Sequence, residues 1–293
     1  MATQILQKYK HGSEQAVQWL MSRFKEDGSY GSNIRDLASY YKSPYLLHLS
    51  GRVEESYQLL TYIKNKFMQD NGDFVTAENI KSENEAFSEY WAYINGWLAL
   101  SAQKLGRFDV AYPAYQYLIS FYHPKHGGFT TNKPYGQADN VMDVLSTAHL
   151  GLTSLYFGDL EKAKSAGELL QRFMSMQPDI KQGFYLRLND AGKIITDFPQ
   201  EAGIFFKVSA VHPDQAYFMI GYPIAFLGKL YQATHDKRYL DTTKCYLDFA
   251  LNCHDGLCTC HFSHKVAWGA AIVAKLTGEP RFADLAITIA DYL

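Results

Sequence analysis

Residues 26–31 read EDGSYG, and a glycine loop of this kind returns four more times along the sequence, each time between helical segments. The later loops read DNGDF at 70–74, HGGF at 126–129, KQGFY at 181–185 and HDGLC at 254–258. Their glycines advance by 44 residues from Gly28 to Gly72, then by 56, 55 and 73 to Gly128, Gly183 and Gly256. A recurring interval of this length holds two helices and two connections, so the sequence predicts a repeat architecture.

Apolar residues at spacings of three and four predict helices between these loops. The expected helices cover residues 13–24, 36–50, 53–68, 84–105, 107–122, 140–157, 159–176, 214–234, 237–252, 263–277 and 280–292. Short connections carry a glycine just past a helical segment, where a left-handed C-cap is favoured; these are Gly51, Gly106, Gly158 and Gly278. Only the segment 183–196, with Asn189–Gly192 as its turn, is convincing as a pair of strands.

Tight connections that alternate with long ones describe stacked helical hairpins. We therefore expect a single all-α domain over residues 1–293, an α/α toroid of about five to six hairpins with one short β-hairpin insertion. The helix that follows each long loop, the second of its pair, would line the inside of the ring, and these helices are the more apolar ones. An open solenoid is the rival architecture.

Composition restricts the classes of function. With 47% apolar residues, 28 basic and 30 acidic side chains, the chain is neither disordered nor basic enough for a nucleic-acid partner. The N-terminus shows no signal peptide, which favours a cytoplasmic protein, and the apolar segment 217–227 is too short for a membrane span. The 22 Tyr, 18 Phe and 4 Trp suit either helix packing or an aromatic cavity with few polar groups.

The segment 23–51 carries a resemblance to a known superfamily. Its glycine loop is followed by Asp36 and a helix rich in Tyr and Leu, and the pattern returns more weakly at 70–74 and 126–129. In this it resembles the repeat of the terpenoid cyclase and prenyltransferase α/α toroids. Sugar epimerases and several glycosidases also use helical-hairpin toroids. The cyclase acid motif, the class I magnesium motif and a clear set of prenyltransferase zinc ligands are all missing, so the resemblance implies an architecture and leaves the chemistry open.

In such a toroid the cavity opens where the long loops enter the lining helices, so candidate catalytic residues follow the glycine loops. On this basis we expect Asp36, Asp139, Asp143, His212 and His261 to converge on one cavity. Asp139 and Asp143 are four residues apart and would share one helical face, where two carboxylates can produce a general acid. Plain helix capping is the alternative for the acidic residues.

The histidines are the expected proton acceptors. His212 precedes Pro213 at the expected helix start, and a histidine there needs little tuning to act as an acid or base near neutral pH. A solvated loop residue is the alternative. The expected substrate-binding residues are aromatic or polar side chains near the same ends of the helices: Tyr40, Glu85, Tyr90, Trp91, Tyr217, His264 and Trp268.

Four cysteines lie close together near the C-terminus, at positions 245, 253, 258 and 260. With His261 and His264 they could bind zinc, but their spacing fits no standard zinc motif. If residues 258–261 are extended, Cys258 and Cys260 point to one side and His261 to the other, which does not gather four ligands. We therefore predict no metal and no cofactor. We expect Cys245 and Cys253 to pack as small apolar groups and His261 or His264 to face the cavity.

These observations favour a cyclase, isomerase or lyase that performs acid–base chemistry on a small, largely apolar substrate. Aromatic faces would stabilise developing positive charge in such a site. A carbohydrate-active epimerase or hydrolase is the alternative, and a non-catalytic helical-repeat binding module is a further one. The scarcity of arginine near the loops, with Arg35 and Arg187 the main examples, gives a slight preference for the apolar substrate. A homo-oligomer is left open.

Overall fold

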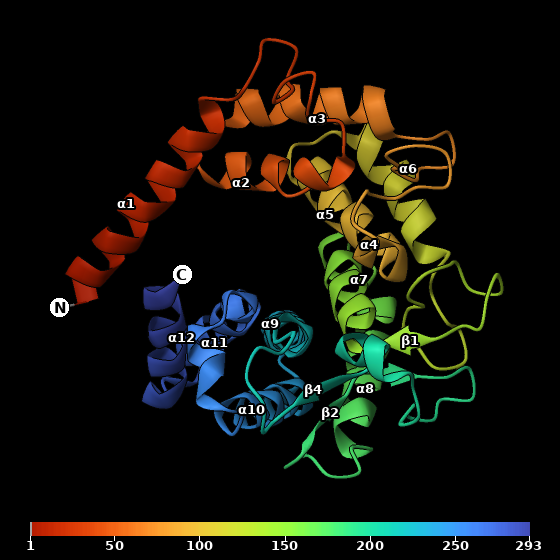
Figure 1. Cartoon of the computed structure of the whole chain (residues 1–293), viewed down its shortest axis with the longest axis vertical. Helices are drawn as coiled ribbons and strands as arrows, with labels where there is room; N and C mark the ends of the chain where they lie inside the picture. Colours follow the sequence, from red (N-terminus) through yellow and green to blue (C-terminus); the bar gives the residue numbers. More distant parts are fainter. Residues whose placement is uncertain (1) are drawn as a thin grey trace. The chain divides into compact units, whose positions relative to one another are not determined.

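The computed structural model describes residues 2–293 and divides into two compact units, which end and begin at Ser120 and Phe121. Figure 1 labels their helices and strands. The expectation of one domain over residues 1–293 stays a prediction. None of the helices within residues 2–293 combines the length and the apolar character that a membrane crossing requires.

The first unit is built from helices alone. Its elements are α1 (Ala2–Met21), the 3₁₀ helix η1 (Leu37–Ser39), α2 (Ser43–Leu49), α3 (Val53–Phe67), α4 (Ala86–Glu89), α5 (Trp91–Lys104) and α6 (Phe108–Ile119). Helices α2 and α5 pack on each other, α3 packs on α2, and α6 packs on α5. Helix α5 is buried around almost its whole circumference, as an apolar helix enclosed by neighbours must be.

The second unit repeats this arrangement with strands added at its loops. Its helices are α7 (Val144–Tyr156), α8 (Leu160–Ser175), η2 (Gln200–Phe205), α9 (Phe218–Thr234), α10 (Lys237–Leu251), η3 (Asp255–Thr259), η4 (His261–Ser263), α11 (His264–Thr277) and α12 (Pro280–Tyr292). Helices α7, α9 and α11 pack side by side, and each carries one of α8, α10 and α12 against it. The first three are the more apolar, as expected for the lining helix of each hairpin.

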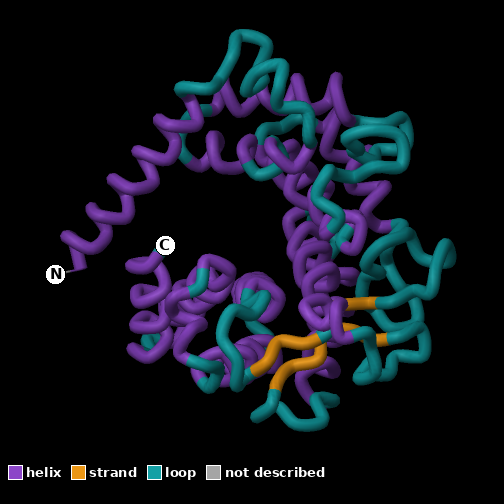
Figure 2. Tube along the Cα trace, viewed as in Figure 1, coloured by secondary structure: helices purple, strands orange, loops and turns teal. Residues whose placement is uncertain are grey.

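The strands differ from the expected hairpin. They are β1 (Met142–Asp143), β2 (Gly183–Tyr185), β3 (Arg187–Leu188) and β4 (Lys207–Ser209), drawn in orange in Figure 2. Strand β3 pairs with β1 and β2 pairs with β4, both antiparallel, so each half of 183–188 pairs mainly with a distant segment. The turn after Asn189 forms as predicted, but it contributes only a single bridge, between Leu188 and Ile194.

Glycine anchors three of the long loops to a helix of the same repeat. A Cβ atom on Gly72 would lie 2.1 Å from the carbonyl oxygen of Pro113 in α6, so only glycine allows this approach. Gly28 makes the same contact with the carbonyl oxygen of Gln58 in α3, and a Cβ atom on Gly127 would lie 2.9 Å from the Cβ of Ser165 in α8. In all three cases the partner is the sixth residue of its helix. The sequence repeat therefore corresponds to a recurring contact between a glycine loop and the second helix that follows it.

Several expected helix boundaries need correction. The helix expected at 36–50 is reduced to η1 and α2, and the one expected at 84–105 is interrupted at Tyr90, whose φ of −124° and ψ of 58° are not helical. The helix expected from residue 140 begins only at Val144, because β1 precedes it. The four glycines predicted as C-caps do have positive φ angles, between 68° and 79°.

Candidate functional site

Two loops of the second unit are brought together by the close packing of α9 on α11. A Cβ atom on Gly221 of α9 would lie 2.4 Å from both the carbonyl carbon of Lys265 and the nitrogen of Val266 in α11. The two helix backbones therefore touch within a turn of where both helices begin. The segments that lead into these helices, residues 207–217 and 252–263, must end side by side; we call them the histidine loops.

Direct contacts join the histidine loops. The thiol of Cys260 lies 3.9 Å from the carbonyl oxygen of Gln215, and the backbone N–H of His254 donates to the carbonyl oxygen of Ala210 at 2.7 Å. At the start of the two helices the rings of Phe218 and Phe262 meet edge to face, 5.5 Å apart. The loops thus bring His212, His254 and His261 into one region of the second unit, next to His264 at the start of α11.

His264 is held in a defined orientation. Its Nδ1 lies 2.8 Å from the carbonyl oxygen of His261. Because a carbonyl oxygen can only accept, Nδ1 carries the proton, and in the neutral form of the ring Nε2 is the nitrogen without one. This is the tautomer in which a histidine can serve as a general base through Nε2. The sequence predicted His261 as a catalytic residue and His264 as a substrate-binding one. In the structure the ring of His264 is the positioned one, and His261 supplies its carbonyl group.

His212 lies on an exposed turn rather than at the start of a helix. Helix α9 begins at Phe218, four residues later than expected. Asp214, the expected helix start, adopts a left-handed φ of 55°. The hydroxyl of Tyr217 donates to the His212 carbonyl oxygen at 3.3 Å. Burial raises the pKa of Tyr217 to about 12, so at neutral pH this phenol is a hydrogen-bond donor. Tyr217, expected to bind substrate, is fully buried and supports the loop.

An aromatic and cationic cluster lies one turn further along these helices. The ammonium group of Lys265 stands 5.1 Å from the ring centres of both Tyr222 and Trp268. On its other side Tyr222 meets the ring of His149 in α7, 5.3 Å away. Trp268 is half-buried, so part of its side chain stays exposed. The sequence analysis identified Trp268 but not His149 or Lys265. The only local signal for these two is that each is a polar residue in an otherwise apolar helix.

The cysteines next to this region are thiols. Cys253 is buried, and burial raises its pKa to about 12, which makes it unreactive at neutral pH. Cys245 was expected to pack inside but is exposed on α10. Of residues 258–261, expected to be extended, only Cys260 is so; Cys258 belongs to η3 and His261 begins η4. Within residues 2–293, no group of three or more His, Cys, Asp or Glu side chains could hold a metal ion.

The expected pair Asp139 and Asp143 does not share a helical face. Asp139 is exposed in the loop before β1, whereas Asp143 is fully buried at the end of that strand. As the N-cap of α7, Asp143 accepts a hydrogen bond from the backbone of Ser146. Its register partner across the β1–β3 pair is Arg187, which is also buried. Asp143 is thus a helix cap, which was the alternative interpretation. The two carboxylates do not lie on one helical face, as a proton-sharing pair would require.

The remaining predicted residues belong to the first unit. Asp36 caps η1 and accepts hydrogen bonds from Thr76 at 2.9 Å and Ser82 at 2.8 Å. Tyr40 is fully buried and donates to the carbonyl oxygen of Ile34 at 2.6 Å, so it packs in the core instead of lining an open surface. Of the others, Glu85 is exposed and Tyr90 and Trp91 are buried. Convergence of all five expected catalytic residues on one cavity stays a prediction.

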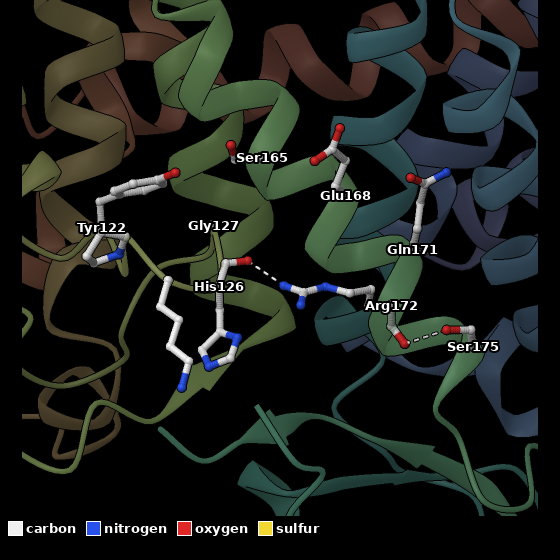
Figure 3. Close-up of a pocket in the computed structure, with 10 residues that line it drawn as sticks. Tyr122, His126, Gly127, Ser165, Glu168, Gln171, Arg172 and Ser175 are labelled. Atoms are coloured by element: carbon white, nitrogen blue, oxygen red, sulfur yellow. Dashed lines mark hydrogen bonds between the residues drawn. The ribbon is translucent and has the colours of Figure 1, made fainter. Parts of the chain in front are cut away.

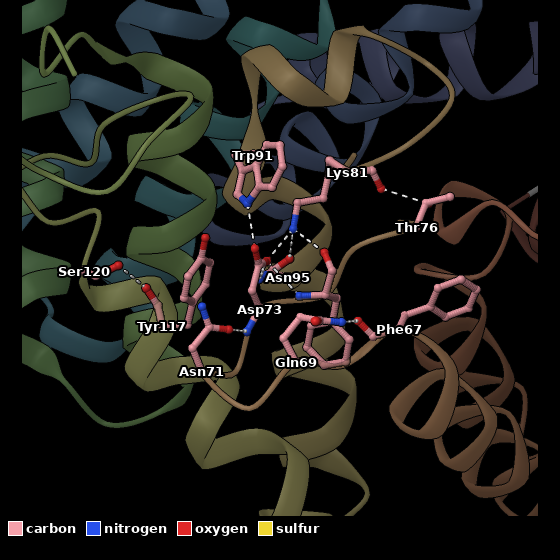
Figure 4. A network of polar contacts seen from close by, with 11 residues as sticks. Phe67, Gln69, Asn71, Asp73, Thr76, Lys81, Trp91, Asn95, Tyr117 and Ser120 are labelled. Carbon is pink, nitrogen blue, oxygen red and sulfur yellow. Dashed lines mark hydrogen bonds and ion pairs between the residues drawn. The ribbon is translucent and has the colours of Figure 1, made fainter. Parts of the chain in front are cut away.

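A buried charge pair dominates the polar contacts of the first unit. Lys81 has no exposed surface and binds the carboxylate of Asp73, the carbonyl oxygen of Phe74 and, at 2.8 Å, the side-chain oxygen of Asn95 (Figure 4). Trp91 donates its indole N–H to Asp73 at 2.9 Å. Burial opposes ionisation of Asp73, but Lys81 and these hydrogen bonds hold its pKa below the ordinary value. The sequence showed Asp73 only as part of a glycine loop. Because this network is enclosed, its role is to stabilise the fold.

Solved structures of similar α/α-toroid fold include enzymes named for carbohydrate substrates. A D-mannose isomerase matches 98% of this chain over 85% of its own length, with a TM-score of 0.72 and 14% identity. A GH76 α-mannanase of Bacteroides thetaiotaomicron matches 96% of the chain over 82% of its own, with a TM-score of 0.61 and 13% identity. The unsaturated glucuronyl hydrolase of Bacillus sp. GL1 matches 100% over 84%, with a TM-score of 0.60 and 13% identity.

These structural similarities establish the fold. The sequence identities are too low to carry information on activity. The chain therefore has the helical-hairpin fold predicted from its glycine loops. No protein-family profile matches the sequence, and no curated protein matches it.

Proposed function

We propose that this chain is a carbohydrate-active isomerase or epimerase whose active site is formed by the histidine loops and the first turns of α9 and α11. The observation that carries the proposal is His264, half-buried, with its tautomer fixed by the carbonyl group of His261. The toroid enzymes that share the fold act on carbohydrates by name, which supports the alternative reading of the sequence. The terpenoid-cyclase reading finds no support in them.

The reaction needs one proton moved between neighbouring carbons of an open-chain sugar. His264 Nε2 removes the proton from C2 of the aldose, and the electron pair of that C–H bond forms the C1–C2 double bond of an enediol. The carbonyl oxygen at C1 takes up a proton from a second acid. Return of a proton to C1, with loss of the O2 proton, gives the ketose, whereas return of a proton to C2 on the opposite face, with loss of the O1 proton, gives the epimer. His212 and His261 are exposed on the same loops and supply the second acid or base.

The neighbouring cluster provides a binding surface for a sugar. The less polar face of a pyranose packs on an aromatic ring, and Trp268 offers a half-buried indole beside the ammonium of Lys265. The buried phenol of Tyr222 supports this indole edge to face at 6.3 Å. A polar, cationic cluster with one open aromatic face suits a hydroxylated ligand better than a hydrocarbon.

Glycoside hydrolysis is less well supported by this arrangement. It requires two carboxylic groups about 5 to 10 Å apart, one protonated and one ionised. In the second unit, Asp143 is buried as a helix cap and Asp139 lies in an exposed loop, so the expected carboxylate pair is absent from these two positions. Histidines are better suited than carboxylates to moving protons in both directions near neutral pH.

The test follows hydrogen exchange at the sugar carbons. The full chain is incubated with mannose, glucose or fructose in D₂O, and deuterium at C1 and C2 is followed by NMR. The proposal expects deuterium to appear together with the isomeric sugar, and His264→Asn to abolish both. Release of free sugar from aryl glycosides without any exchange into monosaccharides would overturn the isomerase assignment in favour of a hydrolase.

A further inference from the structure

A separate pocket lies outside the histidine loops, between the chain that follows α6 and the outer face of α8 (Figure 3). Its volume of about 680 Å³ is in the range of small-molecule sites. One wall is the segment 122–127, and the other is formed by Ser165, Glu168, Gln171 and Arg172 of α8. Figure 3 shows the guanidinium group of Arg172 extending from α8 to the backbone of His126 on the opposite wall.

The two walls are fixed to each other before any ligand arrives. Gly127 rests on Ser165, where a Cβ atom would come within 2.9 Å of the serine Cβ. Arg172 donates from Nη2 to the carbonyl oxygen of His126. The ring of His126 is tied from behind by its Nε2, which donates to the carbonyl oxygen of Asp190 at 3.0 Å. A ligand would therefore not have to order this segment, which lowers the free-energy cost of binding.

The charges of this pocket are left open to a ligand. Glu168 and Arg172 are four residues apart on α8, a spacing at which they ordinarily pair. Here Arg172 turns to His126 instead, and within residues 2–293 Glu168 joins no ion pair or hydrogen bond. The Nε and Nη1 groups of Arg172 likewise make no hydrogen bond within the described residues. Donors and acceptors thus stand apart in one preformed space, with the exposed Lys125 at its edge.

We propose that this pocket binds an anionic monosaccharide unit, separate from the proposed active site. The guanidinium of Arg172 and the ammonium of Lys125 bind the acidic group, since Arg matches the geometry of a carboxylate or phosphate. Glu168 and Gln171 accept and donate hydrogen bonds to the sugar hydroxyls. The ring of Tyr122 supplies the apolar surface for the less polar face of the sugar. The acidic group is a uronate carboxylate or a sugar phosphate, which present the same charge to Arg172.

The test is calorimetric titration of the full chain with glucuronate, glucose 6-phosphate, glucose and inorganic phosphate. We expect one of the two acidic sugars to bind at least about 10-fold more tightly than glucose or phosphate, because both the charge and the hydroxyls contribute. Arg172→Gln should weaken that binding by about 10-fold or more. Lys164→Gln, an exposed change on the same helix outside the pocket, should leave it unchanged.

Two results would overturn the proposal. Equal affinity for inorganic phosphate and both sugars would reduce the pocket to a plain anion site, and an unaltered titration of Arg172→Gln would place the binding elsewhere. The hydrogen-exchange assay of the proposed active site is a separate readout. Arg172→Gln is expected to keep that exchange, so failure of the pocket and failure of the isomerase proposal are distinguishable.

Discussion

Gly221 and Lys265 bring two helices into backbone contact. The space for a Cβ atom on Gly221 is taken by the Lys265 carbonyl carbon 2.4 Å away. Because the histidine loops lead directly into these two helices, this contact sets the distance between the loops. Any side chain at position 221 must separate the helices, so a substitution there tests whether the proposed site depends on their spacing.

Gly221→Ala is expected to lower both stability and turnover. Overpacking of this kind costs about 1–3 kcal/mol, and the loops move apart with the helices. Gly12→Ala is the matched control: Gly12 is also helical, nothing lies within 4 Å of its missing Cβ, and alanine there should stabilise by up to about 1 kcal/mol. Urea unfolding and the exchange assay measure both effects. Normal stability and turnover in Gly221→Ala would refute the close contact.

His264→Asn is expected to reduce isomerisation by about 10²- to 10⁴-fold while the free energy of unfolding changes little. Asparagine removes the imidazole base but keeps a polar side chain of similar reach. The control is His11→Asn on α1, where a histidine lies outside the proposed site. If His264→Asn retains wild-type turnover in a folded protein, His264 is not the base and the assignment passes to His212 or His261.

Trp268→Ala is expected to act mainly on substrate binding. Loss of the open indole face should raise KM by about 10-fold and change kcat less, because the ring would stabilise the bound sugar and the transition state alike. Trp19→Ala, which removes a tryptophan that is 60% exposed on α1, serves as the control. A fall in kcat at unchanged KM would contradict a purely binding role.

Asp73→Asn is expected to destabilise the protein by about 3–5 kcal/mol, because Lys81 then remains buried without its counter-charge. Lys81→Met should cost a similar amount. The double variant should lose much less than the sum of the two, since no unpaired charge is left. Urea unfolding of the four proteins forms a double-mutant cycle, and strictly additive losses would show that the pair is not coupled.

The same carboxylate predicts a pH dependence of stability. The pKa of Asp73 is lowered in the folded protein relative to about 3.9 in the unfolded chain, so its contribution is fully present above that value. It is lost as the pH falls through the folded pKa, because the proton then binds in both states. Unfolding curves recorded from about pH 5 down to about pH 2 should therefore show a steeper acid decline in the wild type than in Asp73→Asn.

The sequence predicted the parts of the fold that depend on neighbouring residues. Gly51, Gly106, Gly158 and Gly278 end helices because a left-handed C-cap needs no distant partner. The hairpin expected over 183–196 is confirmed only next to its turn, where Leu188 pairs with Ile194. Its turn is local, but the strands around Leu186 pair with segments far along the chain, and short strands carry no mark of their partners.

The candidate site was predicted in part for a similar reason. His212, His261 and His264 were expected to act because they follow glycine loops, and the structure gathers their loops in one unit. Asp143 follows such a loop as well, yet its pairing with β3 buries it. Lys265 and His149 could not be found from spacing, since their roles arise from rings on other helices.

The contacts of Gly28, Gly72 and Gly127 close each of three repeats onto its own beginning. In each case the loop that opens the repeat rests on the helix that completes it, so the closing contact needs no residue from a later repeat. A chain leaving the ribosome can therefore finish one repeat before the next is synthesised, and contacts this local favour rapid folding. Because of this closing contact, the segment that runs from the loop glycine to the end of the second helix is a self-contained unit. It is the length that a gene duplication would have to copy to add one complete repeat.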